Sequence, residues 1–178
     1  YRDTIYKGGI YWGDFMSMYI PDTTAQCIYP GPVEGKLPPA NLAADIVSNP
    51  CDGPYFWERS GYTKADKIKV PILSMATQYN MNHLRGQLDI YTRIKSTKKL
   101  VVAPRTGFFS HVYFRYSKPL KEQLLRWYDY WLKGIDTGIM NEPQVAIFDL
   151  ATREWFYENE YPLARTQWTK YYLRAGQS

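Results

Sequence analysis

The chain has 178 residues, enough for one ordinary domain or for parts of two. Hydrophobic residues make up 45% of it and charged residues 22%, a balance typical of a globular protein and not of a disordered one. The net charge of +5 is spread along the chain without a basic motif, which argues against nucleic-acid binding. The sequence has no run of 18 apolar residues, so no membrane span is expected.

Residues 1–62 are rich in proline and glycine and predict loops and short helices packed by aromatic side chains. Such a segment is typical of a cover over a pocket rather than of a sheet. One short helix is expected over residues 41–47, where Asn41 is a candidate N-terminal cap. The start has no signal-peptide character and no initiator Met, and the missing Met suggests an excised or incomplete chain. The sequence does not give the compartment, and a cytoplasmic location is the expectation.

Strand and helix patterns alternate from residue 70 onward. Residues 70–76 and 99–103 are short apolar runs that predict buried strands. Residues 83–94 and 120–132 have apolar side chains at helical spacing, and Gly134 supplies a stop for the second helix. This order predicts an α/β fold whose strands are parallel and joined by right-handed crossover helices.

The pattern changes again after Pro143, where no long helix is expected. Residues 145–150 and 168–173 predict two strands, separated by residues 155–162. We therefore expect the chain to leave the α/β unit for a β-rich segment.

Residues 126–143 read RWYDYWLKGIDTGIMNEP and closely resemble the last helix and exit loop of the Xaa-Pro dipeptidyl-peptidase and cocaine esterase (CocE/NonD) family of serine hydrolases. Weaker matches follow the order of that family. They are residues 1–4 with 8–10, 55–60, 68–73, and Trp155 with 161–166. The resemblance spans nearly the whole chain.

The resemblance implies the second half of an α/β-hydrolase core, with a partial helical cap and the first strands toward a C-terminal jelly roll. Residues 1–62 would form the cap segment, 63–143 the core half and 144–178 the β-rich exit. The implied substrate is a small-molecule ester or a peptide, and the implied partner is the remainder of the hydrolase chain or another subunit. No cofactor or metal is expected, because the sequence has no zinc pair, phosphate loop or dinucleotide motif.

Acyl transfer on this fold requires a serine on a Gly-x-Ser-x-Gly elbow, a histidine that takes its proton and an acid that orients the histidine. None of the serines has the flanking glycines of the elbow; they are Ser17, Ser48, Ser60, Ser74, Ser96, Ser110, Ser117 and Ser178. The chain is therefore expected to contain no nucleophile.

Both remaining positions depart from the family pattern. The resemblance puts Asn80 at the position of the acid and Gly107 at the position of the histidine. Asparagine can orient a histidine by hydrogen bonding but supplies no negative charge. His111 follows the same predicted strand as Gly107 and is the candidate base. A loop imidazole packed among aromatic side chains is the alternative interpretation of His111.

Other titratable residues are weaker candidates. His83 is predicted at a helix start, as a structural or surface residue. Asp89 and Asp129 are conceivable replacement acids, but both fall within predicted helices. Cys27 and Cys51 are the only cysteines, and nothing requires a disulfide between them.

Three hypotheses for the function stay open. The first is a fragment or divergent member of a serine hydrolase that acts on ester or Xaa-Pro peptide bonds. The second is a non-catalytic binding protein on a degenerate hydrolase scaffold, suggested by Asn80 and Gly107. The third is a subunit whose sheet is completed by another chain.

Overall fold

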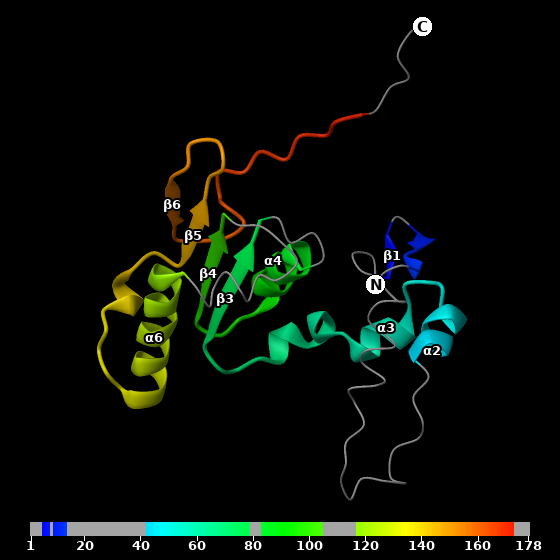
Figure 1. Ribbon diagram of the computed structural model, residues 1–178, viewed down its shortest axis with the longest axis horizontal. Coiled ribbons are helices and arrows are strands. Elements are labelled where there is room, and N and C mark those ends of the chain that lie inside the picture. The colour runs from blue at the N-terminus through cyan, green and yellow to red at the C-terminus, as the bar shows by residue number, and fades with distance from the viewer. Residues whose placement is uncertain (1–4, 8, 14–41, 79–82, 105–116, 173–178) are drawn as a thin grey trace, which may run out of the picture.

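The structure is a computed structural model that describes residues 5–7, 9–13, 42–78, 83–104 and 117–172 (Figure 1). Its main element is a four-stranded sheet in the order β3-β4-β5-β6. The strand bounds are Ile72–Thr77 for β3, Lys98–Ala103 for β4, Val145–Phe148 for β5 and Trp155–Glu158 for β6. Helices α4 (Leu84–Arg93) and α6 (Lys118–Lys133) follow β3 and β4 in the chain.

A small N-terminal unit lies beside the sheet and contains a hairpin that the sequence pattern did not predict. Strands β1 (Tyr6–Lys7) and β2 (Ile10–Tyr11) pair antiparallel, and the turn between them contains Gly9 at φ +87°, a left-handed conformation that favours glycine. Helices α2 (Leu42–Ser48) and α3 (Pro54–Arg59) complete the unit. Buried Tyr6 and Ile46 form its small core, with Phe56 packed against them.

The predicted pairing of the two buried strands is confirmed. β3 and β4 lie side by side in parallel, with Ile72 opposite Lys98 and Thr77 opposite Ala103. β5 adds in parallel to β4, and β6 turns back antiparallel to β5, so the sheet is mixed. The α/β class expected from the alternation of strands and helices is therefore correct.

Helix α4 covers one face of the sheet. Successive strand residues point to opposite faces, and α4 packs on the face to which the even-numbered residues of β4 point. Tyr91 of α4 is 1% exposed and packs with Leu100 and Val102 of β4. Leu84 and Leu88, at a spacing of four residues, add to the same stripe of the helix. The 3-10 helix η1 (Gly61–Lys67) packs against the helix and joins the N-terminal unit to the sheet.

Helix α6 covers the opposite face, where the odd-numbered residues of β4 point. Val101 and Ala103 form a buried cluster with Leu120 of α6. The helix ends where the sequence predicted, at Gly134, whose φ of +71° and backbone N–H bonds cap the last turn. Figure 1 shows α4 and α6 on either side of the strands.

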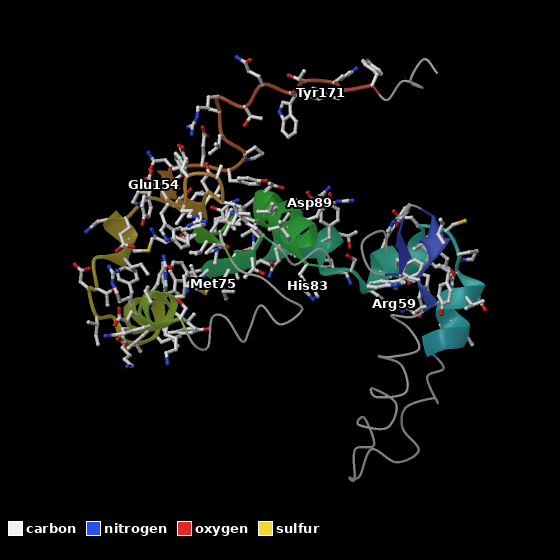
Figure 2. All side chains as sticks on the ribbon, turned by 45° about the horizontal axis from the view of Figure 1, so that its top comes forward. Arg59, Met75, His83, Asp89, Glu154 and Tyr171 are labelled. Atoms are coloured by element: carbon white, nitrogen blue, oxygen red, sulfur yellow. The ribbon has the colours of Figure 1, made fainter. Side chains whose placement is uncertain are left out.

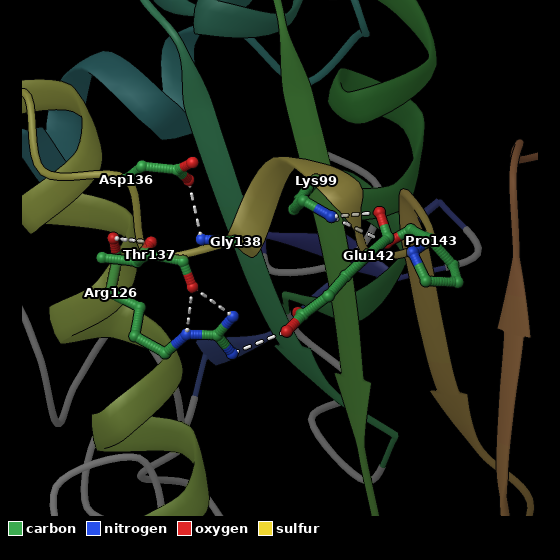
Figure 3. A network of polar contacts seen from close by, with 7 residues as sticks. All are labelled: Lys99, Arg126, Asp136, Thr137, Gly138, Glu142 and Pro143. Atoms are coloured by element: carbon green, nitrogen blue, oxygen red, sulfur yellow. Dashed lines mark hydrogen bonds and ion pairs between the residues drawn. The ribbon is translucent and has the colours of Figure 1, made fainter.

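A polar network ties α6 and the loop after it to the sheet (Figure 3). Lys99 of β4 is 3% exposed and donates from Nζ to the backbone oxygens of Glu142 and Pro143, at 2.6 and 2.9 Å. Arg126 of α6 pairs with the Glu142 carboxylate at 2.6 Å and donates to the backbone oxygen of Thr137 at 2.9 Å from Nη2. The loop between α6 and β5 is thus bound by Lys99 of the sheet and by Arg126 of the helix before β5 begins.

The prediction for the last segment is confirmed for its first strand, which is β5, and wrong for its second. Residues 155–162, expected to separate two strands, contain β6, whereas described residues 168–172 form no strand and lie exposed. Trp168 and Tyr171 are 84% and 92% exposed, and Figure 2 shows Tyr171 on an extended arm away from the sheet. Residues 155–158 pair with β5 because a turn that begins at Asp149 brings the chain directly back onto that strand. The N–H of Asp149 donates to Glu154 O across this turn at 2.8 Å.

Candidate functional site

The candidate site lies at the carboxyl ends of β3 and β4. Thr77 and Ala103 are the last residues of these strands and are direct partners in the sheet. The N–H of Gln78 extends the ladder by donating to Ala103 O at 3.1 Å. In open α/β sheets this edge is where ligands bind, because loops from neighbouring parallel strands leave it together.

The two residues predicted to act in catalysis, Asn80 and His111, lie outside the described residues, as does Gly107. The described strands nevertheless show where the segments that carry Asn80 and His111 leave the sheet. Residues 79–82 follow β3 and residues 105–116 follow β4, from strand ends about 5 Å apart. The roles of Asn80 and His111 stay predictions.

Gln78 is a site residue that no sequence motif had indicated. Its side-chain amide donates to the backbone oxygen of Phe148, so it connects the end of β3 to the end of β5 across β4. Its position directly after a buried strand is the signal that could have identified it, since polar residues there often face a binding site.

A cavity of about 490 Å³ opens beside this edge on the α4 face of the sheet. Gln78 and Leu84 line it, and these two residues flank the segment that carries Asn80. The other lining residues are mainly aliphatic: Leu88, Val102, Ile147, Leu150 and Tyr161. The cavity is therefore suited to an apolar group of moderate size with one or two polar atoms.

Tyr161 lines the cavity, and the ring of Tyr91 lies 6.5 Å from the ring of Tyr161 between centroids. Burial raises the pKa of both phenols above 10.0, and the nearby Asp89 carboxylate raises the pKa of Tyr161 further. Both side chains stay protonated at neutral pH and can donate a proton in a hydrogen bond, but neither can act as a base there. A base at this edge has to come from another residue.

Thr77 closes β3 with a hydroxyl that is fully buried and has no hydrogen-bond partner among the described residues. An unpaired buried hydroxyl costs roughly 1–3 kcal/mol relative to a paired one. The Thr77 hydroxyl therefore lowers the stability of the folded chain at the strand end beside the candidate site.

The other candidate acids lie on helices and are paired there with basic residues. Asp129 of α6 forms an ion pair with Lys133 at 2.6 Å, on the side of the sheet opposite to α4. Asp89 lies on α4 and contacts Arg85 at 3.7 Å. His83 precedes α4, as predicted, and is exposed without capping the helix through its side chain (Figure 2).

The described serines occupy ordinary structural positions. Ser60 caps η1, Ser74 lies within β3, and Ser96 donates to the backbone oxygen of Val70 at 2.8 Å. Ser117 precedes α6 and Ser48 ends α2. Ser17, Ser110 and Ser178 lie outside the described residues.

The described part of the chain contains no group of three or more histidine, cysteine or acidic side chains arranged to hold a metal ion. None of its helices is long and apolar enough to cross a membrane. Cys51 is exposed with a free thiol, and Cys27 lies outside the described residues.

Comparisons with known proteins show a similarity in fold to solved structures. The sequence matches no family model and no curated protein. Two crystal structures of SACOL2612, a CocE/NonD family hydrolase from Staphylococcus aureus, resemble this structure. The first has a TM-score of 0.76 and 20% identity over 95% of this chain, and the second has a TM-score of 0.61 and 21% identity over 70%.

These identities are low, so the comparison shows that the fold is similar to that of a CocE/NonD hydrolase and shows no more. The chain spans 29% and 22% of the lengths of the two matched chains. The family resemblance stated from residues 126–143 is thereby supported at the level of fold, whereas its finer implications belong to the proposal that follows.

Proposed function

We propose that this chain carries the acid and base positions of a hydrolase that acts on ester or Xaa-Pro peptide bonds. The observation that supports this most is the parallel pairing of β3 and β4, in a fold similar to a CocE/NonD hydrolase. The segments with Asn80 and His111 leave the sheet from adjacent strand ends, which is the arrangement that an acid–base pair of this fold requires.

In the proposed reaction, a serine outside this chain attacks the substrate carbonyl while His111 takes its proton. His111 then returns that proton to the leaving alcohol or amine, and water completes the hydrolysis by the same route. Asn80 orients the imidazole by a hydrogen bond but does not stabilise its positive charge. The serine is provided by the remainder of the hydrolase chain or by another subunit.

The apolar cavity beside Gln78 fits the acyl part of the substrate, with the Tyr161 hydroxyl as a hydrogen-bond donor. The proposal places the C-terminal side of the hydrolase core and the start of a jelly roll in this chain. A cytoplasmic location is part of the same proposal.

The test is turnover of a p-nitrophenyl ester by the native protein that contains this chain. Replacing His111→Gln should lower kcat by roughly 10²–10⁴-fold, the usual contribution of a general base. The matched change His83→Gln should leave the rate unchanged, because His83 is exposed at the start of α4. Equal rates for the wild type and His111→Gln would refute the role of His111.

A second candidate function is non-catalytic binding of a similar ligand. It is favoured by the departures at Asn80 and Gly107 and by a described cavity whose lining phenol, Tyr161, stays protonated at neutral pH and so cannot act as a base. The double change Asn80→Asp with Gly107→His separates the two functions. A protein that binds the ester saturably, hydrolyses it only after both changes, and resists a fluorophosphonate probe beforehand belongs to the second class.

A further inference from the structure

A second cavity, of about 770 Å³, lies where the N-terminal unit meets α4. Residues of α3 and η1 form one wall, and one face of α4 forms the other. Three arginines and three aromatic residues line it: Phe56, Trp57, Arg59, Tyr62, Arg85 and Arg93. Figure 2 shows Arg59 and Asp89, which come from the two walls.

The acidic residues of this cavity are already engaged. Asp52 accepts a hydrogen bond from the indole N–H of Trp57 at 2.9 Å. Asp89 lies 3.7 Å from Arg85, one helical turn away on α4. Two carboxylates therefore face three guanidinium groups, which leaves a net positive charge along the cavity.

Arg93 is held in a fixed orientation without a carboxylate. Its guanidinium lies 3.8 Å over the ring of Tyr62 and also donates to the Tyr62 hydroxyl. No carboxylate among the described residues pairs with it. Stacking on a ring fixes the plane of a guanidinium while leaving N–H groups at its edge, the geometry that binds carboxylates in bidentate fashion.

Arg59 is arranged in the same way on the opposite wall. Its guanidinium lies 4.0 Å over the ring of Tyr55 and donates to the Tyr55 backbone oxygen at 2.9 Å. Its contact with Glu58 is 3.7 Å long, and both side chains are more than half exposed, so this ion pair contributes little. Two pre-oriented guanidinium groups thus line one cavity.

The same cavity has a flat apolar wall. Trp57 is 51% exposed although it is an aromatic residue, and Phe56 lies next to it in α3. An exposed indole offers a flat apolar surface on which a planar ring can stack, next to the cationic groups of the same cavity.

We propose that this cavity binds an organic anion with a planar apolar body, such as an aromatic carboxylate. The carboxylate pairs with Arg93 and Arg59, and the ring packs on Trp57. This site is separate from the proposed catalytic edge, and the inference does not depend on hydrolytic activity.

The experiment is calorimetric titration of the native protein with benzoate, and in parallel with benzyl alcohol and acetate. Benzyl alcohol keeps the ring without the charge, and acetate keeps the charge without the ring. Benzoate should bind saturably and at least about tenfold more tightly than either, since both groups of contacts contribute. Its affinity should fall as ionic strength rises.

Two arginine variants and one control test the residues. Arg93→Gln and Arg59→Gln should each weaken benzoate binding by about tenfold. Lys118→Gln removes one positive charge from the exposed start of α6 and should leave the affinity unchanged. Circular dichroism checks that each variant is folded.

Three results would overturn the inference. They are an absence of saturable benzoate binding to the native protein, equal affinity for benzoate and benzyl alcohol, and wild-type affinity in both arginine variants. Because none of these measurements involves ester turnover, they are independent of the proposed hydrolase function.

Discussion

Replacing Lys99→Met tests whether a buried ammonium holds the loop after α6 against the sheet. Lys99 is 3% exposed, and its Nζ donates to two backbone oxygens, Glu142 O and Pro143 O (Figure 3). Methionine keeps the length and apolar stem of the side chain but removes both donors, so it leaves two carbonyl groups without their partner.

The magnitude follows from opposing effects. Losing the partner of a fully buried acceptor costs roughly 1–3 kcal/mol, so about 2–6 kcal/mol is an upper bound for two, because Glu142 is only half-buried and Pro143 is exposed. Burying an ammonium carries a desolvation penalty of several kcal/mol, which the change to methionine removes. We therefore expect Lys99→Met to lower the free energy of unfolding by about 2 kcal/mol, toward the lower end of that sum.

Urea unfolding followed by tryptophan fluorescence measures this change. The exposed residue Lys118 provides the control, because Lys118→Met should alter the free energy of unfolding by less than about 0.5 kcal/mol. A Lys99→Met protein as stable as the wild type would refute the reasoning, since desolvation would then fully offset the two hydrogen bonds.

The pH dependence of the same residue has a definite sign. Burial lowers the pKa of Lys99 below 10.5, with Arg126 acting in the same direction and Glu142 opposing it. Well below the folded pKa, Lys99 is protonated in both states, and folding carries the full cost of burying its charge. As the pH rises from the folded pKa toward 10.5, the unfolded state binds more protons, so the free energy of unfolding increases. This increase should be smaller in Lys99→Met, and a larger one in that variant would contradict the assignment.

Three further changes probe other features. Thr77→Val should raise the free energy of unfolding by about 1 kcal/mol in thermal or urea unfolding, because it removes a buried hydroxyl without a described partner; a loss of similar size would instead indicate a partner for that hydroxyl. Gly134→Ala should cost about 1–2 kcal/mol through its φ of +71° alone, since an added Cβ meets no atom within 4 Å; an unchanged midpoint would show that α6 can end differently. Lys98→Met should lower the free energy of unfolding by about 1–2 kcal/mol and increase amide hydrogen exchange at the end of α4, because Lys98 caps this helix by donating to Tyr91 O and Ile94 O at 2.7 and 2.6 Å. Amide exchange at the wild-type rate would argue against capping by Lys98.

Hydrophobic periodicity was sufficient to predict the elements of the α/β unit. β3 and β4 are apolar runs of six residues, a length typical of strands, whereas α4 and α6 keep apolar side chains at helical spacing over 10 and 16 residues, so length and spacing together distinguish the two. Parallel pairing then follows from the crossover through α4.

Hydrophobic periodicity did not identify which of two similar aromatic-rich runs pairs with β5. Residues 155–158 and 168–172 are both aromatic-rich, but only the first is close enough along the chain to return onto β5 through a tight turn. That turn depends on Asp149, which accepts from Ala151 N at 2.7 Å, and on Arg153 at φ +61°, and neither signal is visible in hydrophobic periodicity.

The candidate site could be located from the sequence only as far as its strand ends. Asn80 and His111 were singled out through a family resemblance, whereas Gln78 and the cavity beside it arise from contacts between β3, β5 and α4. Tyr161 joins this cavity from a segment that resemblance associated with a later β-domain, and no local pattern predicts that contact.

The arrangement of the sheet also restricts how a shifted acid–base pair can arise. Moving the base from position 107 to His111 keeps it in the segment that follows β4, and four residues span at most about 14 Å, so the strand need not change. Moving the acid to Asp129 would require a residue of α6, on the opposite face from the cavity and already paired with Lys133. We therefore keep Asn80 as the proposed orienting residue, and Asn80→Asp should raise kcat more than any acid introduced on α6. A rate that depends on Asp129 but not on Asn80 would show that the edge formed by β3 and β4 is not where the reaction takes place.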